Sequence, residues 1–97
     1  MFRHVALFRF VPEATNEQRQ AVVEGLRGLP ALIPELIDYR VGPDAGLGAD
    51  NFDLAVVADF ARPEHYDVYV AHTAHEAIAS TLVRPILAAR AAVQYEC

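Results

Sequence analysis

The stretch FRHVALFRF, residues 2–10, decides the fold, because its side chains alternate with the period of two that is typical of a β-strand. One face carries Phe2, His4, Ala6, Phe8 and Phe10, and the other carries Arg3, Val5, Leu7 and Arg9. The centre of each face is apolar, so we expect both sides of this strand to be covered.

A capping box marks the start of the first helix. Thr15 is the expected N-cap, and the side chain of Gln18 reaches back to its backbone. Gly28 and Pro30 predict where this helix ends. Its inward apolar stripe consists of Val22, Val23, Leu26 and Leu29.

Three further strands are predicted downstream. Leu36–Val41 and Phe52–Phe60 have the apolar content of strands, and Ala91–Glu96 is the expected closing strand. Residues 42–51 are rich in Gly and Asp and are typical of an exposed hairpin loop.

The second helical region is predicted from Pro63, which suits a first helical turn, to about Ala89. A second capping box, Thr73-Ala74-His75-Glu76, predicts that a new helix begins at Thr73. The inner stripe of this new helix is Ile78, Leu82 and Ile86, and Pro85 would kink or shorten its end.

The resulting order is βαββαβ, which is typical of an α+β, ferredoxin-like fold. We expect residues 1–97 to form one domain, a four-stranded antiparallel sheet with its helices on one face. Two helices cover only one face of such a sheet, so the other apolar face needs a second cover. A second copy of the chain would supply it, and we expect a homodimer through the sheet face.

The composition of the chain indicates which classes of binding partner are not expected. The net charge is −5 and no basic stretch occurs, so nucleic-acid binding is not expected. No apolar run approaches membrane-spanning length and no signal peptide is evident, which indicates a cytoplasmic protein with no membrane contact. The single cysteine, Cys97, excludes a disulfide within the chain.

The segment YDVYVAHTAHE, residues 66–76, holds the candidate chemistry. Tyr69 and His75 would lie on different sides of an unbroken helix, but a break at Thr73 lets them converge. His75 would then sit near a positive helix end, which keeps its imidazole neutral and able to accept a proton. Tyr69 could donate a hydrogen bond to a carbonyl or enolate oxygen. The alternative is that both are polar groups at a helix junction, bonded to nearby backbone.

The sequence gives weaker evidence for a catalytic or metal-binding role of the other histidines. His4, within an apolar strand face, is more typical of a satisfied core histidine than of a catalyst. His72 and His75 have a spacing that two metal ligands can share, and Glu76 is adjacent, but no third ligand follows at a recognisable spacing. No metal site is expected.

Three segments together resemble the stress-responsive α/β-barrel (Dabb) family. HVALFRF at residues 4–10 is similar to its opening strand, YVAHTAH at residues 69–75 to its Tyr-x-x-His-Pro-x-His motif, and VQYE at residues 93–96 to its closing strand. The resemblance implies a dimeric α+β barrel. Thr73 departs from the family proline, and Gln94 stands at about the position of a pocket acid found in one enzymatic branch.

That branch, the olivetolic acid cyclase-like proteins, closes a linear polyketide by a C2–C7 aldol condensation without a cofactor. The resemblance implies catalytic roles for His75 and Tyr69 and a substrate-binding role for His4; Phe8 and His72 are also expected to bind substrate. One hypothesis is thus a cofactor-free enzyme acting on a polyketide-like or other β-dicarbonyl compound. The other is a non-catalytic, stress-associated dimer whose pocket holds a small apolar molecule.

Overall fold

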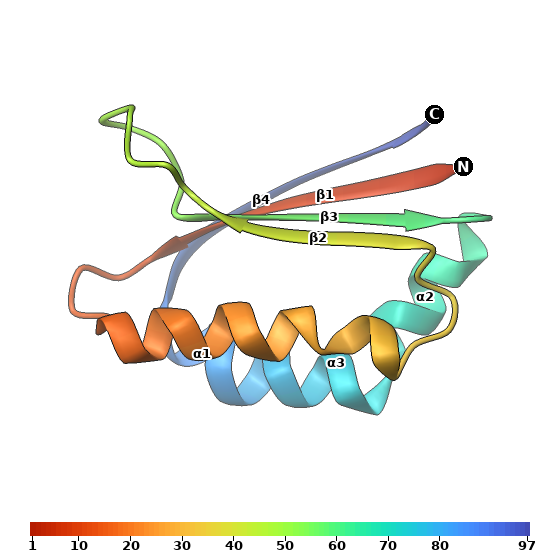
Figure 1. The fold of residues 1–97 in the computed structure, drawn as a ribbon, viewed down its shortest axis with the longest axis horizontal. Coiled ribbons are helices and arrows are strands. Elements are labelled where there is room, and N and C mark those ends of the chain that lie inside the picture. Colours follow the sequence, from red (N-terminus) through yellow and green to blue (C-terminus); the bar gives the residue numbers. More distant parts are fainter.

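The computed structural model describes residues 1–97 and arranges them in two layers, a sheet and a set of helices on one of its faces (Figure 1). The sheet is antiparallel, with the strand order β2-β3-β1-β4. Its strands are β1 (Phe2–Phe10), β2 (Asp38–Pro43), β3 (Leu54–Phe60) and β4 (Leu87–Glu96). The predicted ferredoxin-like fold is confirmed.

The helical layer has three α-helices and three irregular turns. A 3₁₀ turn follows α1, and a π-helical turn and a second 3₁₀ turn follow α3. The helices are α1 (Asn16–Arg27), α2 (Glu64–Ala71) and α3 (Thr73–Ile78), and the turns are Leu29–Ala31, Ala79–Val83 and Arg84–Ile86. None of the helices has the length and apolar character needed to span a bilayer.

The start of α1 follows the predicted capping box. Thr15 Oγ1 accepts from the backbone N–H of Gln18, and Gln18 Oε1 accepts from the backbone N–H of Thr15. Further along α1, a Cβ atom added at Gly25 would lie 2.9 Å from the Cδ1 of Ile78 and 3.1 Å from that of Leu82. The glycine therefore allows α1 to pack closely against the segment that follows α2.

Three predicted boundaries were wrong. The second strand was predicted at Leu36–Val41 but begins at Asp38, because Leu36 instead packs into the core from the connecting segment. The third strand begins at Leu54 rather than Phe52. The helical region ends at Ile86, and β4 begins at Leu87, where pairing with β1 overrides the helical preference of the alanines that follow.

The predicted break in the second helical region is confirmed, but its cap is one residue earlier than expected. His72, not Thr73, is the N-cap of α3: its backbone is extended (φ −63°, ψ 136°), and its Nδ1 accepts from the backbone N–H of Ala74 at 3.0 Å. The π-helical turn after Ile78 also changes which side chains face inward. Val83 and Ile86 are buried, whereas Ile78 and Leu82 are only partly so.

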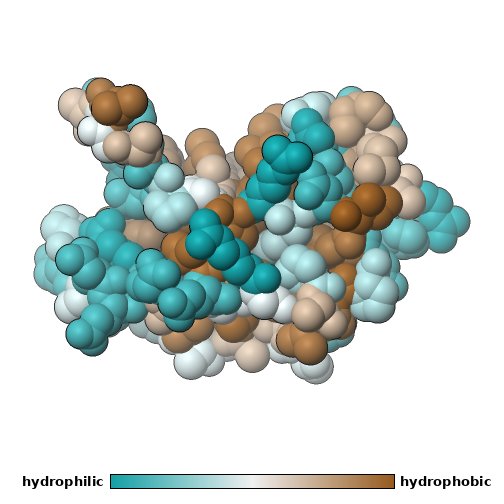
Figure 2. Space-filling view, viewed as in Figure 1, coloured by the Kyte–Doolittle hydropathy of each residue, from teal (hydrophilic) through white to brown (hydrophobic).

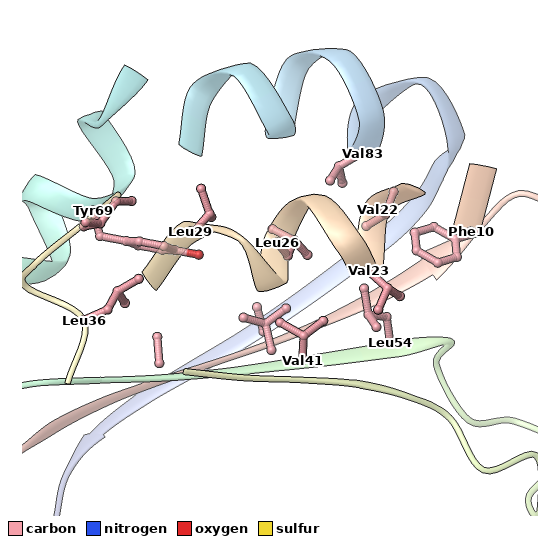
Figure 3. Close-up of a cluster of buried hydrophobic side chains, with 14 of the residues drawn as sticks. Phe10, Val22, Val23, Leu26, Leu29, Leu36, Val41, Leu54, Tyr69 and Val83 are labelled. Atoms are coloured by element: carbon pink, nitrogen blue, oxygen red, sulfur yellow. The ribbon is translucent and has the colours of Figure 1, made fainter. Parts of the chain in front are cut away.

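The hydrophobic core lies between the two layers (Figure 3). The face of β1 that carries Ala6 and Phe10 points into this core, and β3 contributes Val56 and Phe60 from the neighbouring strand. The largest fully buried side chains are Phe60, Leu29, Ile33, Val22 and Val56.

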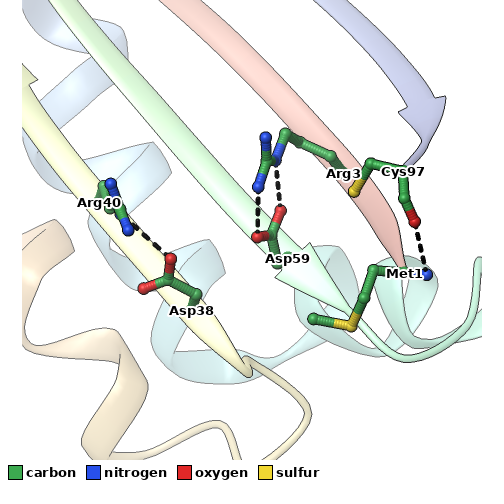
Figure 4. A network of polar contacts seen from close by, with 6 residues as sticks. All are labelled: Met1, Arg3, Asp38, Arg40, Asp59 and Cys97. Carbon is green, nitrogen blue, oxygen red and sulfur yellow. Dashed lines mark hydrogen bonds and ion pairs between the residues drawn. The ribbon is translucent and has the colours of Figure 1, made fainter.

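The opposite face of the sheet has no cover within the chain. Its centre holds Val5 and Val57, paired across β1 and β3 and only partly buried. Val93 on β4 continues the same row and is 58% exposed. An ion pair closes one end of this face, where Arg3 Nε lies 2.7 Å from Asp59 Oδ1 (Figure 4). The Arg3 hydrogen bonds hold the pKa of Asp59 below its ordinary value.

Figure 2 shows hydrophilic residues over the N-terminal part of α1 and hydrophobic atoms between the helices and the sheet. Hydrophobic atoms also mark the loop between β2 and β3, which projects away from the helices (Figures 1 and 2). Leu47 of this loop is 93% exposed. The loop therefore carries an exposed apolar side chain of its own, in addition to those of the open sheet face.

We predict that His72→Ala destabilises the fold by about 1 kcal/mol, because the first turn of α3 loses the acceptor for its Ala74 N–H. Thr73→Ala is the matched control. It changes the first helical residue without removing this bond, and its effect should stay within about 0.5 kcal/mol. Urea unfolding of both variants measures the difference, and equal destabilisation would contradict the assigned cap.

Candidate functional site

A cavity of about 220 Å³ lies between the helical layer and the sheet. Its wall is mostly apolar, with contributions from β1, α1, β3 and the turns after α3. Its polar and ionisable side chains are two histidines, two arginines and two tyrosines: His4, His75, Arg84, Arg90, Tyr66 and Tyr69. The structure therefore brings His4, Phe8, Tyr69 and His75 around one cavity, the arrangement expected from the sequence.

The break between α2 and α3 brings Tyr69 and His75 into contact. Tyr69 lies near the end of α2 and His75 in the first turn of α3, and their ring centroids are 4.5 Å apart with the rings tilted by 59°. The Tyr69 ring is only 3% exposed, and its hydroxyl lies 2.9 Å from the hydroxyl of Tyr39 on β2. Tyr69 therefore contacts His75 through its ring and Tyr39 through its hydroxyl.

His75 has the features of a proton acceptor. Its Nδ1 atom is buried and has no hydrogen-bond partner. Burial lowers the pKa of its imidazole, and the positive charges of Arg90 and Arg84 act in the same direction. The Val70 carbonyl and the Glu76 carboxylate oppose this shift. The position of His75 near a helix end predicted a neutral imidazole, but in the structure burial is the main cause of its lowered pKa.

His4 lies in the floor of the cavity and is 3% exposed. The side-chain amide of Gln94 lies 2.9 Å from its Nδ1, so the amide N–H donates to this nitrogen and the neutral ring carries its proton on Nε2. Burial, aided by Arg90 and His75, lowers the pKa of His4 to about 4. Gln94 therefore orients the His4 ring through a neutral amide, which adds no negative charge beside it. An acidic side chain at this position would have stabilised the protonated imidazolium form of His4.

Strand register explains how these residues meet. His4 pairs with Ala58 on one side and with Gln94 on the other, and Ala58 pairs with Tyr39. A single row across all four strands therefore faces the helices with Tyr39, Ala58, His4 and Gln94. Tyr66 of α2 covers this row, and its ring centroid lies 4.7 Å from that of His4.

Tyr39, Tyr66 and Arg90 also belong to this site, although they were not predicted from the sequence. Tyr66 lies in the segment that was singled out, three residues before Tyr69, and this one-turn spacing was a usable signal. Tyr39 and Arg90 come from strands distant in the sequence. Only the pairing register places Arg90 at the cavity and Tyr39 beside the hydroxyl of Tyr69.

His72 is not among the residues that line the cavity. Its Nδ1 is occupied as the cap of α3, so the substrate-binding role expected for it finds no support in this geometry. No group of three or more His, Cys, Asp or Glu side chains is positioned to hold a metal ion.

The protonation states of the site are set by its burial. Both cavity histidines have lowered pKa values, so their rings are neutral near pH 7. Burial raises the pKa values of Tyr39 and Tyr69, which keeps both hydroxyls protonated. The arrangement can therefore accept a proton at an imidazole and donate a hydrogen bond from a phenol at the same pH.

Comparisons with solved structures found close matches over the whole chain. A dimeric ferredoxin-like protein of unknown function from Thermobifida fusca is 43% identical, with a TM-score of 0.90, and the match covers 99% of this chain and 90% of that one. A dimeric protein of ferredoxin-like fold from Bacteroides fragilis is 23% identical, with a TM-score of 0.88 and coverage of 99% and 95%. A hydroxynitrile lyase from Passiflora edulis is 18% identical, with a TM-score of 0.83 and coverage of 97% and 90%, and shares the fold.

The comparison with curated proteins found no match. The family model of the stress responsive A/B barrel domain matches residues 2–97, which is nearly the whole sequence. This match includes the opening strand, the Tyr69–His75 segment and the closing strand that carried the resemblance. The chain belongs to the stress responsive A/B barrel domain (Dabb) family.

Proposed function

We propose that this chain forms a homodimer that binds a small carbonyl compound and removes a proton next to its carbonyl group. A polyketide-like or other β-dicarbonyl compound fits this role, because its acidic α-hydrogens make such a proton transfer accessible to an imidazole. The observation that carries the proposal is the contact between Tyr69 and His75, 4.5 Å between ring centroids, at the wall of a largely apolar cavity.

Each residue has one task in this scheme. The neutral imidazole of His75 takes the α-proton, and the resulting enolate oxygen receives a hydrogen bond from the Tyr69 hydroxyl. Tyr39 supports this donor, since a bond from its hydroxyl to the oxygen of Tyr69 leaves the Tyr69 proton free for the substrate. Phe8 and the other apolar lining residues hold the rest of the molecule.

In the cyclisation form of this reaction, the enolate carbon attacks a second carbonyl of the same chain, and the new alkoxide takes up a proton. The proton held by His75 is a suitable source, so the imidazole would return to its neutral form. One neighbour of the same fold is named a hydroxynitrile lyase, and this name supports the idea that the fold accommodates enzymes.

A second candidate function is a dimer that binds a small apolar molecule without turnover. The burial of Tyr69 favours it, because the ring is only 3% exposed and the hydroxyl already has Tyr39 as a partner. The two candidates differ in one measurable respect. Only the enzymatic one requires His75 for a chemical step.

The homodimer part of the proposal rests on the uncovered sheet face. Val5, Leu7 and Val57 lie on this face, and burying apolar side chains stabilises an interface by about 25 cal/mol per Å² removed from water. The Thermobifida fusca and Bacteroides fragilis proteins, which share the fold, are described as dimeric.

We predict that the wild-type chain sediments as a dimer at micromolar concentration and that Val57→Asp converts it to a monomer. The new carboxylate would lie at the centre of the buried face without a partner. Val68→Asp is the matched control, because Val68 is 43% exposed on α2, in the helical layer on the opposite face of the sheet. A monomeric wild-type chain, or equal behaviour of the two variants, would contradict this interface.

For the reaction, we predict that the wild-type chain accelerates deuterium uptake from D₂O next to the carbonyl of ethyl acetoacetate or phenylacetone. His75→Ala should return the rate to the uncatalysed background, because the base is lost. Tyr69→Phe should lower it by about 10²-fold, since one hydrogen bond to the developing enolate is lost. Proton NMR follows the exchange.

His65→Ala serves as the control, because His65 lies on α2 but is not part of the cavity wall. It should retain the wild-type rate. If wild-type protein exchanges neither compound above background, or if His75→Ala keeps the full rate, the enzymatic proposal fails and the binding dimer remains.

Acid stability tests the buried state of His4. Its pKa is about 4 in the folded chain, against 6.5 for an unperturbed histidine, so the unfolded state binds the extra proton between these values. Stability should be fully present above pH 6.5 and should fall by roughly 2–3 kcal/mol as the pH drops to about 4.5. Urea unfolding at pH 7.5 and 4.5 measures this change. His4→Gln should lose most of the difference, and an unchanged difference in that variant would contradict the assignment.

A further inference from the structure

Seven of the eight arginines of the chain have a polar partner, and one has none. Five form ion pairs with an Asp or Glu, and two donate to backbone carbonyl oxygens. Arg90 alone has neither an ion pair, nor a hydrogen bond, nor an aromatic ring beneath its guanidinium. The paired arginines are Arg3, Arg19, Arg40, Arg62 and Arg84, and the two bonded to backbone oxygens are Arg9 and Arg27.

Arg90 lies on β4 directly opposite Phe8 of β1, on the row that faces the helices, and it lines the cavity. No Asp or Glu lines the cavity with it, although the chain has 13 acidic residues against eight basic ones. Arg84 also lines the cavity, but its guanidinium is paired with Glu76 at 3.2 Å. The cavity wall therefore includes one cationic side chain without a counter-charge, the solvent-exposed Arg90, in a protein whose net charge is −5.

We propose that Arg90 binds a carboxylate on the ligand of this cavity, so that the ligand class is a small, largely apolar carboxylic acid. A guanidinium presents two parallel N–H donors that match the two oxygens of a carboxylate. The apolar wall suits the remainder of such a molecule, and a cavity of about 220 Å³ is of the size that holds one aromatic ring or a short chain.

This inference rests on the proposed function for one point, the orientation of the ligand. A carboxylate held at Arg90 on β4 anchors one end of the molecule, while Tyr69 and His75 approach from the helical layer above the sheet. A keto acid bound in this way would have its carbonyl directed toward the two rings. The charge of Arg90 also favours the neutral form of both cavity histidines, in agreement with a base that stays unprotonated.

The test uses benzoate and benzamide, two probes of nearly the same shape that differ in charge. Calorimetry or NMR titration of the purified chain measures the affinity of each. We expect wild-type protein to bind benzoate about tenfold more tightly than benzamide, since a charge-assisted hydrogen bond has about this effect. Arg90→Gln should abolish the preference, and Arg90→Lys should retain part of it because the charge remains without the forked donors.

Arg62→Gln is the matched control, because Arg62 is exposed, pairs with Glu64 and does not line the cavity. It should keep the full preference for benzoate. Equal affinity for the two probes in the wild-type chain, absence of benzoate binding, or an unchanged preference in Arg90→Gln would overturn the proposal. The wild-type comparison needs no variant, so a misfolded variant does not remove the test.

The result is independent of turnover. A benzoate preference that depends on Arg90, together with no deuterium exchange, would support the carboxylate site and refute the enzymatic function. Exchange that depends on His75, without a benzoate preference, would refute the carboxylate site and leave the proposed reaction intact.

Discussion

The central position of β1 is the constraint on which the rest of this structure depends. β1 pairs with β3 along one edge and with β4 along the other, so its register fixes the register of both neighbours. A shift of one residue would turn His4 to the open face and bring Arg3 or Val5 to the cavity in its place. The row of Tyr39, His4 and Gln94 under the helices exists because both pairings place these residues in line.

The helical layer contributes Tyr69 and His75 to the site, and a break between α2 and α3 brings them together. The extended backbone at His72 separates α2 from α3, and the ring of Tyr69 then meets that of His75. At the same break, the ring of His72 caps α3 by accepting the hydrogen bond from the Ala74 N–H. One histidine of the segment therefore stabilises the geometry that positions the other.

The two faces of the sheet differ in what they contact. The helix-covered face supplies the core, the cavity and the groups whose pKa values are shifted by burial. The open face holds an apolar centre and the Arg3–Asp59 ion pair, and it is where we place the second copy of the chain. The asymmetry follows from the small number of helices, which cover one side of a four-stranded sheet and no more.

Local patterns were enough for the strand at residues 2–10, the capping box at Thr15 and the break near His72, because each depends on neighbours within a few residues. The family motif was likewise readable, and it pointed to Tyr69 and His75. The start of β4, the Tyr39–Tyr69 hydroxyl pair and the unpaired Arg90 were decided only by the tertiary structure. Their positions depend on strand pairing between segments far apart in the chain, and no local periodicity encodes which residue of one strand lies opposite which residue of another.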